Sequence, residues 1–353
     1  MKKMRRTILE GKKIFIGLED SKKTWRINVR FAKMEVHQTG MPADYGNLKR
    51  YIESHFPGCD VTVMYEAGFK GFELHDKLSA DGMRCVVTPP SKVTQAKDSR
   101  VKTDKRDARR LAKNLENGDY VACHVPDRER REDREISRNY EQVKKDICRT
   151  KNRLRGMLKF HGLEGYNTRG AWSDLQYLSL RERTLPKSLA FSLKLKVNHL
   201  EYLFTQRNSL RSYLVQLAKK ERYAASVKAK KSFPGIGILT AIRLTLEWGD
   251  MHRFENGKSI ASFTGLTASE YSTGETIHRG RITGQSAVHI RSWLIQCAWR
   301  AIRKDPVLFN KFHYVWQNSG SKKKAIVAVA RKMAVRMRAV EIANDTYIIG
   351  LVA

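Results

Sequence analysis

Four carboxylates stand where short apolar runs end or where a helix is expected to begin. Glu19 ends the run IFIGLE, and Glu66 ends the run VTVMYE. Asp104 and Asp107 are three residues apart at the start of a segment with helical spacing, so their side chains share one helix face. Carboxylates brought together in this way repel one another unless a cation lies among them, and such hard oxygen ligands suit Mg²⁺ or Mn²⁺. The set therefore indicates a metal site for phosphoryl transfer, in which divalent ions stabilise the attacking and leaving oxygens.

Each acid alone also has an ordinary explanation. Aspartates at a helix start commonly complement the helix dipole, and glutamates at strand ends are often simply solvated. The hypothesis of a metal site therefore depends on the joint arrangement.

Two further segments carry residue types that could act on a phosphodiester. The stretch SEYSTGETIHRGR, residues 269–281, combines hydroxyls, glycines and cations, which suits a nucleophile, although such a run is usually only a loop. PGIG at 234–237, followed by a helical segment, predicts a helix-hairpin-helix turn whose backbone amides would meet a phosphate. A plain turn between two helices is the alternative for PGIG.

The elements that must position these residues alternate in type over the first ~115 residues. Strand patterns are KKIFIGLE, TWRINVRFAK, VTVMYEAG and RCVVTPP, and helical patterns are LKRYIESHF, GFELHDKLSADGM and TDKRDARRLAKNLENG. Thr103 is the expected N-cap of the last helix, and Gly118 is expected just beyond its end. This order predicts an α/β domain with at least one parallel strand pair, over residues 1–125.

Long helices are predicted for the middle of the chain. Apolar residues recur at heptad spacing from about 129 to 160, and a second amphipathic stretch runs from about 187 to 224. The heptad positions are Ile136, Tyr140, Val143, Ile147, Leu154 and Met157, with Thr150 as the one polar seam residue. Residues 126–230 are therefore expected to form an antiparallel coiled-coil arm that supports dimerisation, or else an ordinary helical bundle without an oligomeric role. Residues 231–353 form a third, mostly helical region.

Composition limits the function further. The chain has 353 residues with 68 Lys and Arg against 36 Asp and Glu, so its net charge is +32. Such a surplus points to a polyanion as the partner, most simply nucleic acid. The five scattered cysteines form no CxxC pair, which disfavours a zinc finger or a disulfide scaffold. No apolar run reaches the ~18–20 residues that span a bilayer, and the basic N-terminus lacks the apolar core of a signal peptide.

The combined motifs resemble those of the DEDD-type transposases of insertion sequences, the family of bridge-RNA-guided recombinases whose relatives include the Piv-like DNA invertases. The motifs that carry the resemblance are, in order, IGLEDSKKTW, YEAG, KTDKRDARRLA, FPGIGILTA, GLTASEYSTGE, HRGRIT and HIRSWLIQCAW. The resemblance implies an N-terminal RNase H-like (RuvC-like) catalytic domain and a central coiled-coil arm. It also implies a C-terminal, mostly helical transposase domain with a helix-hairpin-helix-like turn and a catalytic serine loop.

The resemblance also assigns roles to individual residues. The metal-binding catalytic acids would be Glu19, Glu66, Asp104 and Asp107, with glutamate at position 19 where the family has aspartate. Asp20 is the neighbouring alternative, but successive strand side chains point to opposite faces, so we retain Glu19.

The nucleophile would be Ser272, with Thr273 as its alternative because some members carry the serine directly before the glycine. The residues expected to contact nucleic acid are Lys102, Lys105, Arg106, Gly235, Gly237, Arg279 and Arg281. The family usually follows the RIT strand with K-x-G-N, whereas this chain has GQSA at 284–287.

The implied activity is that of a transposase that cuts and rejoins DNA strands with Mg²⁺ or Mn²⁺, using a serine nucleophile. Donor and target DNA, a structured guide RNA encoded by the element, and further copies of the chain would be its partners. The copies would form a dimer, or a tetramer in the synaptic complex, in the bacterial cytoplasm at the nucleoid and away from any membrane. Two alternatives remain: a site-specific invertase or resolvase-like nuclease without a guide, and a non-enzymatic nucleic-acid-binding protein.

Overall fold

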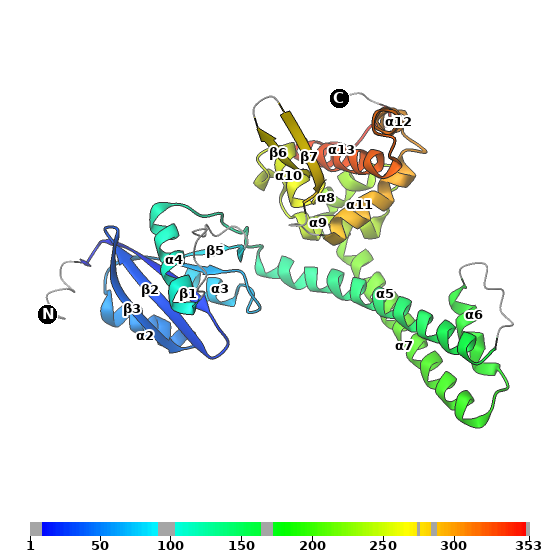
Figure 1. The fold of residues 1–353 in the computed structure, drawn as a ribbon, viewed down its shortest axis with the longest axis horizontal. Coiled ribbons are helices and arrows are strands. Elements are labelled where there is room, and N and C mark those ends of the chain that lie inside the picture. The colour runs from blue at the N-terminus through cyan, green and yellow to red at the C-terminus, as the bar shows by residue number, and fades with distance from the viewer. Residues whose placement is uncertain (1–8, 91–102, 164–171, 274–275, 284–287, 351–353) are drawn as a thin grey trace. The chain divides into compact units, whose positions relative to one another are not determined.

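The computed structural model describes residues 9–90, 103–163, 172–273, 276–283 and 288–350. Within these ranges the side chains of Ser272, Ile277 and Arg279 are not described. The chain forms two compact units, residues 1–126 and residues 127–353. Figure 1 gives the elements of both.

A five-stranded sheet organises the first unit. Its strands are β1 (Lys13–Asp20), β2 (Thr24–Phe31), β3 (Met34–Pro42), β4 (Asp60–Glu66) and β5 (Arg84–Thr88), in the order β3-β2-β1-β4-β5. Strands β1, β2 and β3 are antiparallel neighbours, whereas β1, β4 and β5 run parallel. The predicted mixed α/β architecture with a parallel pair is confirmed, and β3 is a strand that the sequence patterns did not predict.

Helices cover the two faces of this sheet differently. The helices α2 (Tyr45–His55) and α3 (Glu73–Ala80) contribute Leu48 and Leu74 to the larger core, with the buried isoleucines and valines of β1, β2 and β4. The opposite face is covered by α4 (Asp104–Asn117), which packs on β1, β2 and β4 (Figure 1). A side chain at Gly17 would overlap the backbone of α4 at Ala108 and Ala112, so glycine permits this close approach.

The two ends of α4 follow the sequence prediction. The Thr103 side chain accepts a hydrogen bond from the backbone N–H of Arg106 at the start of the helix. Gly118 ends it with a φ of 78°, a left-handed conformation that glycine adopts without strain. Both predicted caps are confirmed, and they fix where the two aspartates of α4 lie along its axis.

Two long helices form the beginning of the second unit. α5 (Arg128–Phe160) matches the predicted helix, and its Val143, Ile147 and Leu154 are buried against α7 (Lys187–Leu217). The short elements α6 (Asp174–Leu178) and η2 (Ser179–Glu182) lie between them in the chain. The second predicted helical stretch, from about 187 to 224, begins as expected, but its helix ends at Leu217. The chain turns at residues 218–220 before α8 (Glu221–Lys231) begins.

The remaining helices of the second unit share one large core. They are α9 (Ile238–Trp248), η3 (Met251–Arg253), α10 (Gly257–Phe263), α11 (Val288–Ala301), α12 (Pro306–Ser319) and α13 (Lys322–Ile342). A separate antiparallel hairpin consists of β6 (Ala268–Thr273) and β7 (Thr276–Ile282). In the part of the chain that the structure describes, no helix has the length and apolar character needed to cross a membrane.

Candidate functional site

Glu19 and Glu66 lie at the ends of two neighbouring parallel strands. The register of β1 and β4 pairs Leu18 with Tyr65, so one further step places Glu19 beside Glu66. Leu18 and Tyr65 are buried in the core on the side of α2 and α3. Because side chains alternate along a strand, the two glutamates point to the opposite face, which α4 covers.

The side chain of Asp20 belongs to the other layer. Trp25 donates its indole N–H to Asp20 Oδ1 at 2.7 Å, and the Lys70 ammonium group lies 3.0 Å from the same oxygen. Asp20 therefore has its partners on the side of the larger core. Of the two adjacent acids, Glu19 is the one on the same face as Glu66.

Asp107 completes this layer from the helix side. It is only 3% exposed, on the face of α4 that packs on the sheet. The Arg110 Nη2 atom lies 2.9 Å from Asp107 Oδ1 and 3.3 Å from Glu66 Oε1, so one guanidinium group bridges the two carboxylates. Asp104, one turn earlier, is exposed.

The structure thus brings three of the four predicted acids to one layer, between α4 and the ends of β1 and β4. Within the described ranges, no three side chains of His, Cys, Asp or Glu already stand close enough together to hold a metal ion. The donor chemistry nevertheless fits Mg²⁺ or Mn²⁺, since Glu66 and Asp107 are hard oxygen donors that converge on one cationic group. Arg110 supplies the charge compensation that a divalent cation would give.

Sequence reasoning did not identify Arg110. The sequence does contain a pair of arginines, Arg109 and Arg110, shortly after the two aspartates of α4, and this pair could have indicated an ion-pair partner for the acids. Helical spacing places Arg110 three residues after Asp107, on its face of the helix, whereas Arg109 lies elsewhere and pairs with Glu35 at 2.7 Å. Of the predicted nucleic-acid contacts in this region, Lys105 and Arg106 are exposed, and Lys102 lies outside the described residues.

The predicted serine segment forms the hairpin β6–β7. Ser272 is paired with Ile277 across the two strands, and Thr273 with Thr276 next to the turn. The side chains of Thr273, His278 and Arg281 are exposed. The hairpin therefore places the Ser272 backbone near its tip, while the Gly274 that follows lies outside the described residues.

The PGIG segment forms a turn between α8 and α9. Gly235 has a φ of +84°, and a Cβ atom there would lie 2.7 Å from the Cys297 carbonyl oxygen, so this glycine allows the turn to pack on α11. Gly237 is the N-cap of α9, makes no side-chain cap hydrogen bond, and has no atom within 4 Å of its notional Cβ. The first N–H groups of a helix have no partner within the helix, so this end of α9 is suited to an anion.

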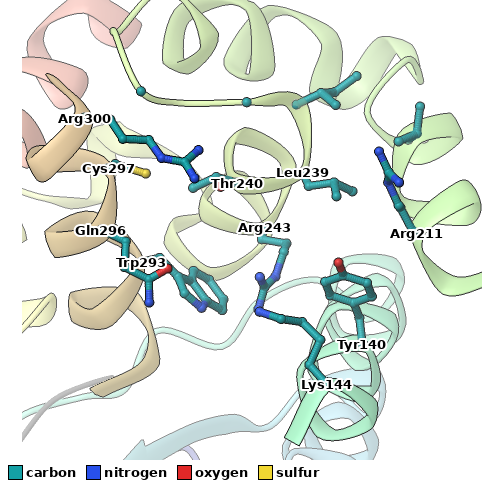
Figure 2. Close-up of a pocket in the computed structure, with 14 residues that line it drawn as sticks. Tyr140, Lys144, Arg211, Leu239, Thr240, Arg243, Trp293, Gln296, Cys297 and Arg300 are labelled. Carbon is teal, nitrogen blue, oxygen red and sulfur yellow. The ribbon is translucent and has the colours of Figure 1, made fainter. Parts of the chain in front are cut away.

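A cavity of about 380 Å³ opens beside this turn, lined by residues of α5, α7, α9 and α11 (Figure 2). Four cations line it, namely Lys144, Arg211, Arg243 and Arg300, and no acidic residue does. We call it the cationic cavity. Its cations come from four helices that are distant in sequence, so the sequence patterns could not reveal it.

Of the four cations, Arg243 has the most complete charge compensation. Arg243 is buried, its guanidinium carbon lies 3.7 Å from the centre of the Trp293 ring, and it forms an ion pair with Glu141. Burial lowers the pKa of Arg243 despite this partner. Arg211 and Arg300 are exposed and form no ion pair within the described part of the chain, so positive charge in the cavity exceeds negative charge.

A second buried carboxylate connects α9 to its neighbours. Glu247 on α9 lies 2.7 Å from Arg134 and 3.3 Å from Arg138, both of α5, and 3.5 Å from the His289 ring of α11. Burial alone raises the pKa of Glu247, but these positive partners outweigh it and lower the pKa to about 2. The carboxylate therefore stays ionised and joins three helices of the second unit.

Two family models match this chain. The model described as "Transposase IS116/IS110/IS902 family" matches residues 227–314, which include the PGIG turn and the β6–β7 hairpin. The DEDD transposase model of the IS110 family matches residues 21–162, which include Glu66, Asp104 and Asp107 but begin after Glu19.

Curated relatives agree with these matches. The y4rJ protein of Sinorhizobium fredii (strain NBRC 101917 / NGR234), whose name describes a transposase, is 28% identical over 92% of this chain and 90% of its own length. The transposase for insertion sequence element IS1533 of Leptospira borgpetersenii is 23% identical over 72% of this chain and 75% of its own length.

A third relative has a different described role. The pilin gene-inverting protein of Moraxella lacunata is 29% identical over 44% of this chain and 49% of its own length. Both family models and the transposase relatives nonetheless point to one assignment. The chain belongs to the IS110 family of DEDD transposases.

Proposed function

We propose that this protein mobilises an insertion sequence by cutting and rejoining DNA strands through metal-dependent phosphoryl transfer, in the bacterial cytoplasm. The observation that carries the proposal is the convergence of Glu66 and Asp107 on one cationic group, with Glu19 on the same face of the sheet. Residues 1–125 would be the RNase H-like catalytic domain. Its sheet order and the position of α4 support this assignment.

Glu66 and Asp107 would hold Mg²⁺ or Mn²⁺, together with Glu19 and with Asp104 from the exposed turn of α4. When bound, the ion would polarise the phosphate and stabilise the charge that develops on its oxygens. Arg110 would leave its bridging position as the ion enters, because it occupies the space between the two carboxylates. The surrounding Lys105 and Arg106 would hold the DNA backbone next to the acids.

Ser272 would be the nucleophile, with Thr273 as the alternative. Its Oγ atom would form an ester bond to the phosphorus while one backbone P–O bond breaks and releases a DNA hydroxyl. Attack by a hydroxyl of another strand would reverse the step, so the bond energy is conserved and no nucleotide cofactor is consumed. Arg279 and Arg281 would stabilise the phosphate oxygens during both attacks.

The same proposal includes the partners. An element-encoded guide RNA would choose the donor and target sequences, which leaves mainly backbone contacts to the protein, and the net charge of +32 supports this division of roles. The helices of residues 126–230 would join protomers, so that the acids of one protomer work with the serine of another. Residues 231–353 would bind DNA through the PGIG turn and the cationic cavity.

One alternative has a specific observation in its favour. The similarity to the pilin gene-inverting protein keeps open an invertase that acts without a guide RNA. Co-purification of one discrete RNA species with the protein would favour the guided recombinase. An RNA-free preparation that recombines its DNA site would favour the invertase.

The acidic site is tested by strand exchange on a DNA substrate in Mg²⁺. Glu66→Gln and Asp107→Asn should each abolish exchange while DNA binding is retained, and Asp119→Asn, an exposed acid beyond the end of α4, is the matched control. Recombination at the normal rate in both variants, or in excess chelator, would refute the metal site. If no variant or condition gives strand exchange although DNA is bound, the non-enzymatic alternative is preferred.

A further inference from the structure

Helix α12 carries a row of aromatic rings along one side. Phe309, His313 and Trp316 are spaced by four and three residues, and the centre of the His313 ring lies 4.6 Å from that of Phe309 and 5.5 Å from that of Trp316. Trp299 of α11 joins the row through Phe312, whose ring centre lies 5.6 Å from that of Trp299 and 6.0 Å from that of Trp316. We call Trp299, Phe309, His313 and Trp316 the aromatic row.

The aromatic row packs against the protein core on one side, and part of its surface on the other side is exposed to solvent. Phe312 is buried in the core of the second unit, which fixes the rings that pack against it. Phe309 remains 46% exposed and Trp299 39% exposed. Large rings held in place with part of their surface in solvent offer a rigid apolar platform, at little further cost in side-chain entropy.

The charge around the row indicates what it could bind. Residues 306–340 contain eight Lys and Arg and no Asp or Glu. The Lys322 ammonium group lies 4.6 Å from the centre of the Trp316 ring, and Arg303 and Lys304 are exposed just before α12. A second copy of this chain, also at +32, would be repelled here, whereas a polyanion would be attracted.

Among possible polyanions, the exposed aromatic rings favour a nucleic-acid strand with unpaired bases. In a duplex the faces of the bases are stacked on one another, so protein rings at the surface reach mainly the backbone. Unpaired bases stack readily on aromatic side chains, and nearby cations hold the phosphates between them. We infer that the aromatic row is a stacking platform for an unpaired segment of a DNA strand.

This inference uses the membership in a family of DNA-acting transposases only to choose DNA over RNA. It depends on neither the metal site nor the serine. It implies that strands are separated in the complex and that the second unit holds one of them during exchange.

The test measures binding of a fluorescent 12-nucleotide dT strand and of a duplex of equal length, by anisotropy in chelator. Phe309→Ala and Trp299→Ala should each weaken binding of the single strand about 5- to 100-fold and leave duplex binding nearly unchanged. Phe160→Ala at the end of α5, where the ring is 85% exposed, is the matched control and should change neither affinity. Trp299→Phe should retain most of the single-strand affinity, because a ring is kept.

A second readout separates stacking from a folding defect. Single-strand binding should quench tryptophan fluorescence, and Trp299→Phe should remove part of that quenching while thermal unfolding stays unchanged. If Phe309→Ala and Trp299→Ala lost equal affinity for single strand and duplex, or lost affinity for neither, the inference would be overturned. A uridine RNA strand that binds more tightly than dT and loses more affinity in the variants would overturn the choice of DNA. Because no step needs metal or strand cutting, failure of the proposed catalytic mechanism would leave this result unaffected.

Discussion

At the scale of single residues, Arg110 decides how the acidic layer behaves without metal. Its guanidinium group bridges Glu66 and Asp107, so a divalent ion must compete with it. Arg110→Ala should therefore bind Mn²⁺ roughly two- to fivefold more tightly than the unchanged protein, as the loss of a partly exposed ion pair would give. Calorimetric titration with Mn²⁺ measures this directly.

The neighbouring arginine supplies the control for this prediction. Arg109 is paired with Glu35 rather than with the predicted acids, so Arg109→Ala should leave the Mn²⁺ affinity near its original value. Weaker Mn²⁺ binding in Arg110→Ala would mean that the arginine organises the carboxylates instead of competing with the ion.

Glu247 gives the second prediction at this scale, on stability against pH. Its pKa is lowered to about 2 in the folded chain, so its contribution is fully present above the ordinary glutamate pKa and is lost as pH falls toward 2. Between about pH 4.5 and pH 2 the second unit should lose up to about 3 kcal/mol from this group.

The comparison uses urea unfolding of the wild type and Glu247→Gln at several pH values. The variant should be less stable at pH 7, because Arg134, Arg138 and His289 lose their buried counterion. It should also lose less stability on acidification than the wild type. If the stability of the two proteins fell in parallel as the pH is lowered, Glu247 would not be the cause of the acid sensitivity.

At the scale of elements, the sequence predicted correctly those features that depend on residues close together in the chain. The caps of α4 and the start and end of α5 could be found because capping and helical spacing involve residues close in sequence. The strand β3 was missed because it is a largely exposed edge strand, and its polar sequence MEVHQTGMP shows little apolar alternation. The turn at residues 218–220 was missed because its sequence, AKK, contains neither Gly nor Pro to signal a turn.

The candidate site was likewise predictable only where its geometry depends on residues close in sequence. Alternation along β1 separates Glu19 from Asp20, and the sequence alone suffices for that argument. The bridge from Arg110 to Glu66 depends on how α4 packs across the sheet, which is a tertiary contact between residues 44 positions apart. The cationic cavity likewise depends on helices that converge only in the folded chain.

The cationic cavity gives a prediction at the element scale. If α7 and α11 each place a cation against a DNA phosphate, Arg211→Gln and Arg300→Gln should each reduce the slope of log K against log salt by about one. The double variant should reduce it by about two. Binding titrations of one duplex at four or more salt concentrations measure the slope.

A matched change elsewhere controls for net charge. Lys194→Gln on α7 removes one exposed cation that does not line the cavity, so it should leave the slope closer to the original value. A slope that falls equally in all three single variants would show that the cavity has no special role in binding.

At the scale of the whole molecule, the two long helices bear on assembly. The heptad seam of α5 is buried by α7 of the same chain, so Ile147 and Leu154 are already satisfied within one protomer. α7 carries a second apolar stripe of Phe191, Leu195 and Tyr202, spaced by four and seven residues and each more than half exposed. An assembly through these helices would therefore use the outer side of α7, and the buried seam of α5 would stabilise each protomer.

Two substitutions separate these roles. Leu195→Asp should lower the oligomer mass seen by sedimentation, with and without DNA, and leave thermal unfolding close to that of the wild type because the position is exposed. Ile147→Asp should instead destabilise α5 and α7, by several kcal/mol, because it buries a charge without a partner. If Leu195→Asp sediments like the wild type in both states, the outer side of α7 does not join protomers. A composite site between protomers would then need an interface on another face of the molecule.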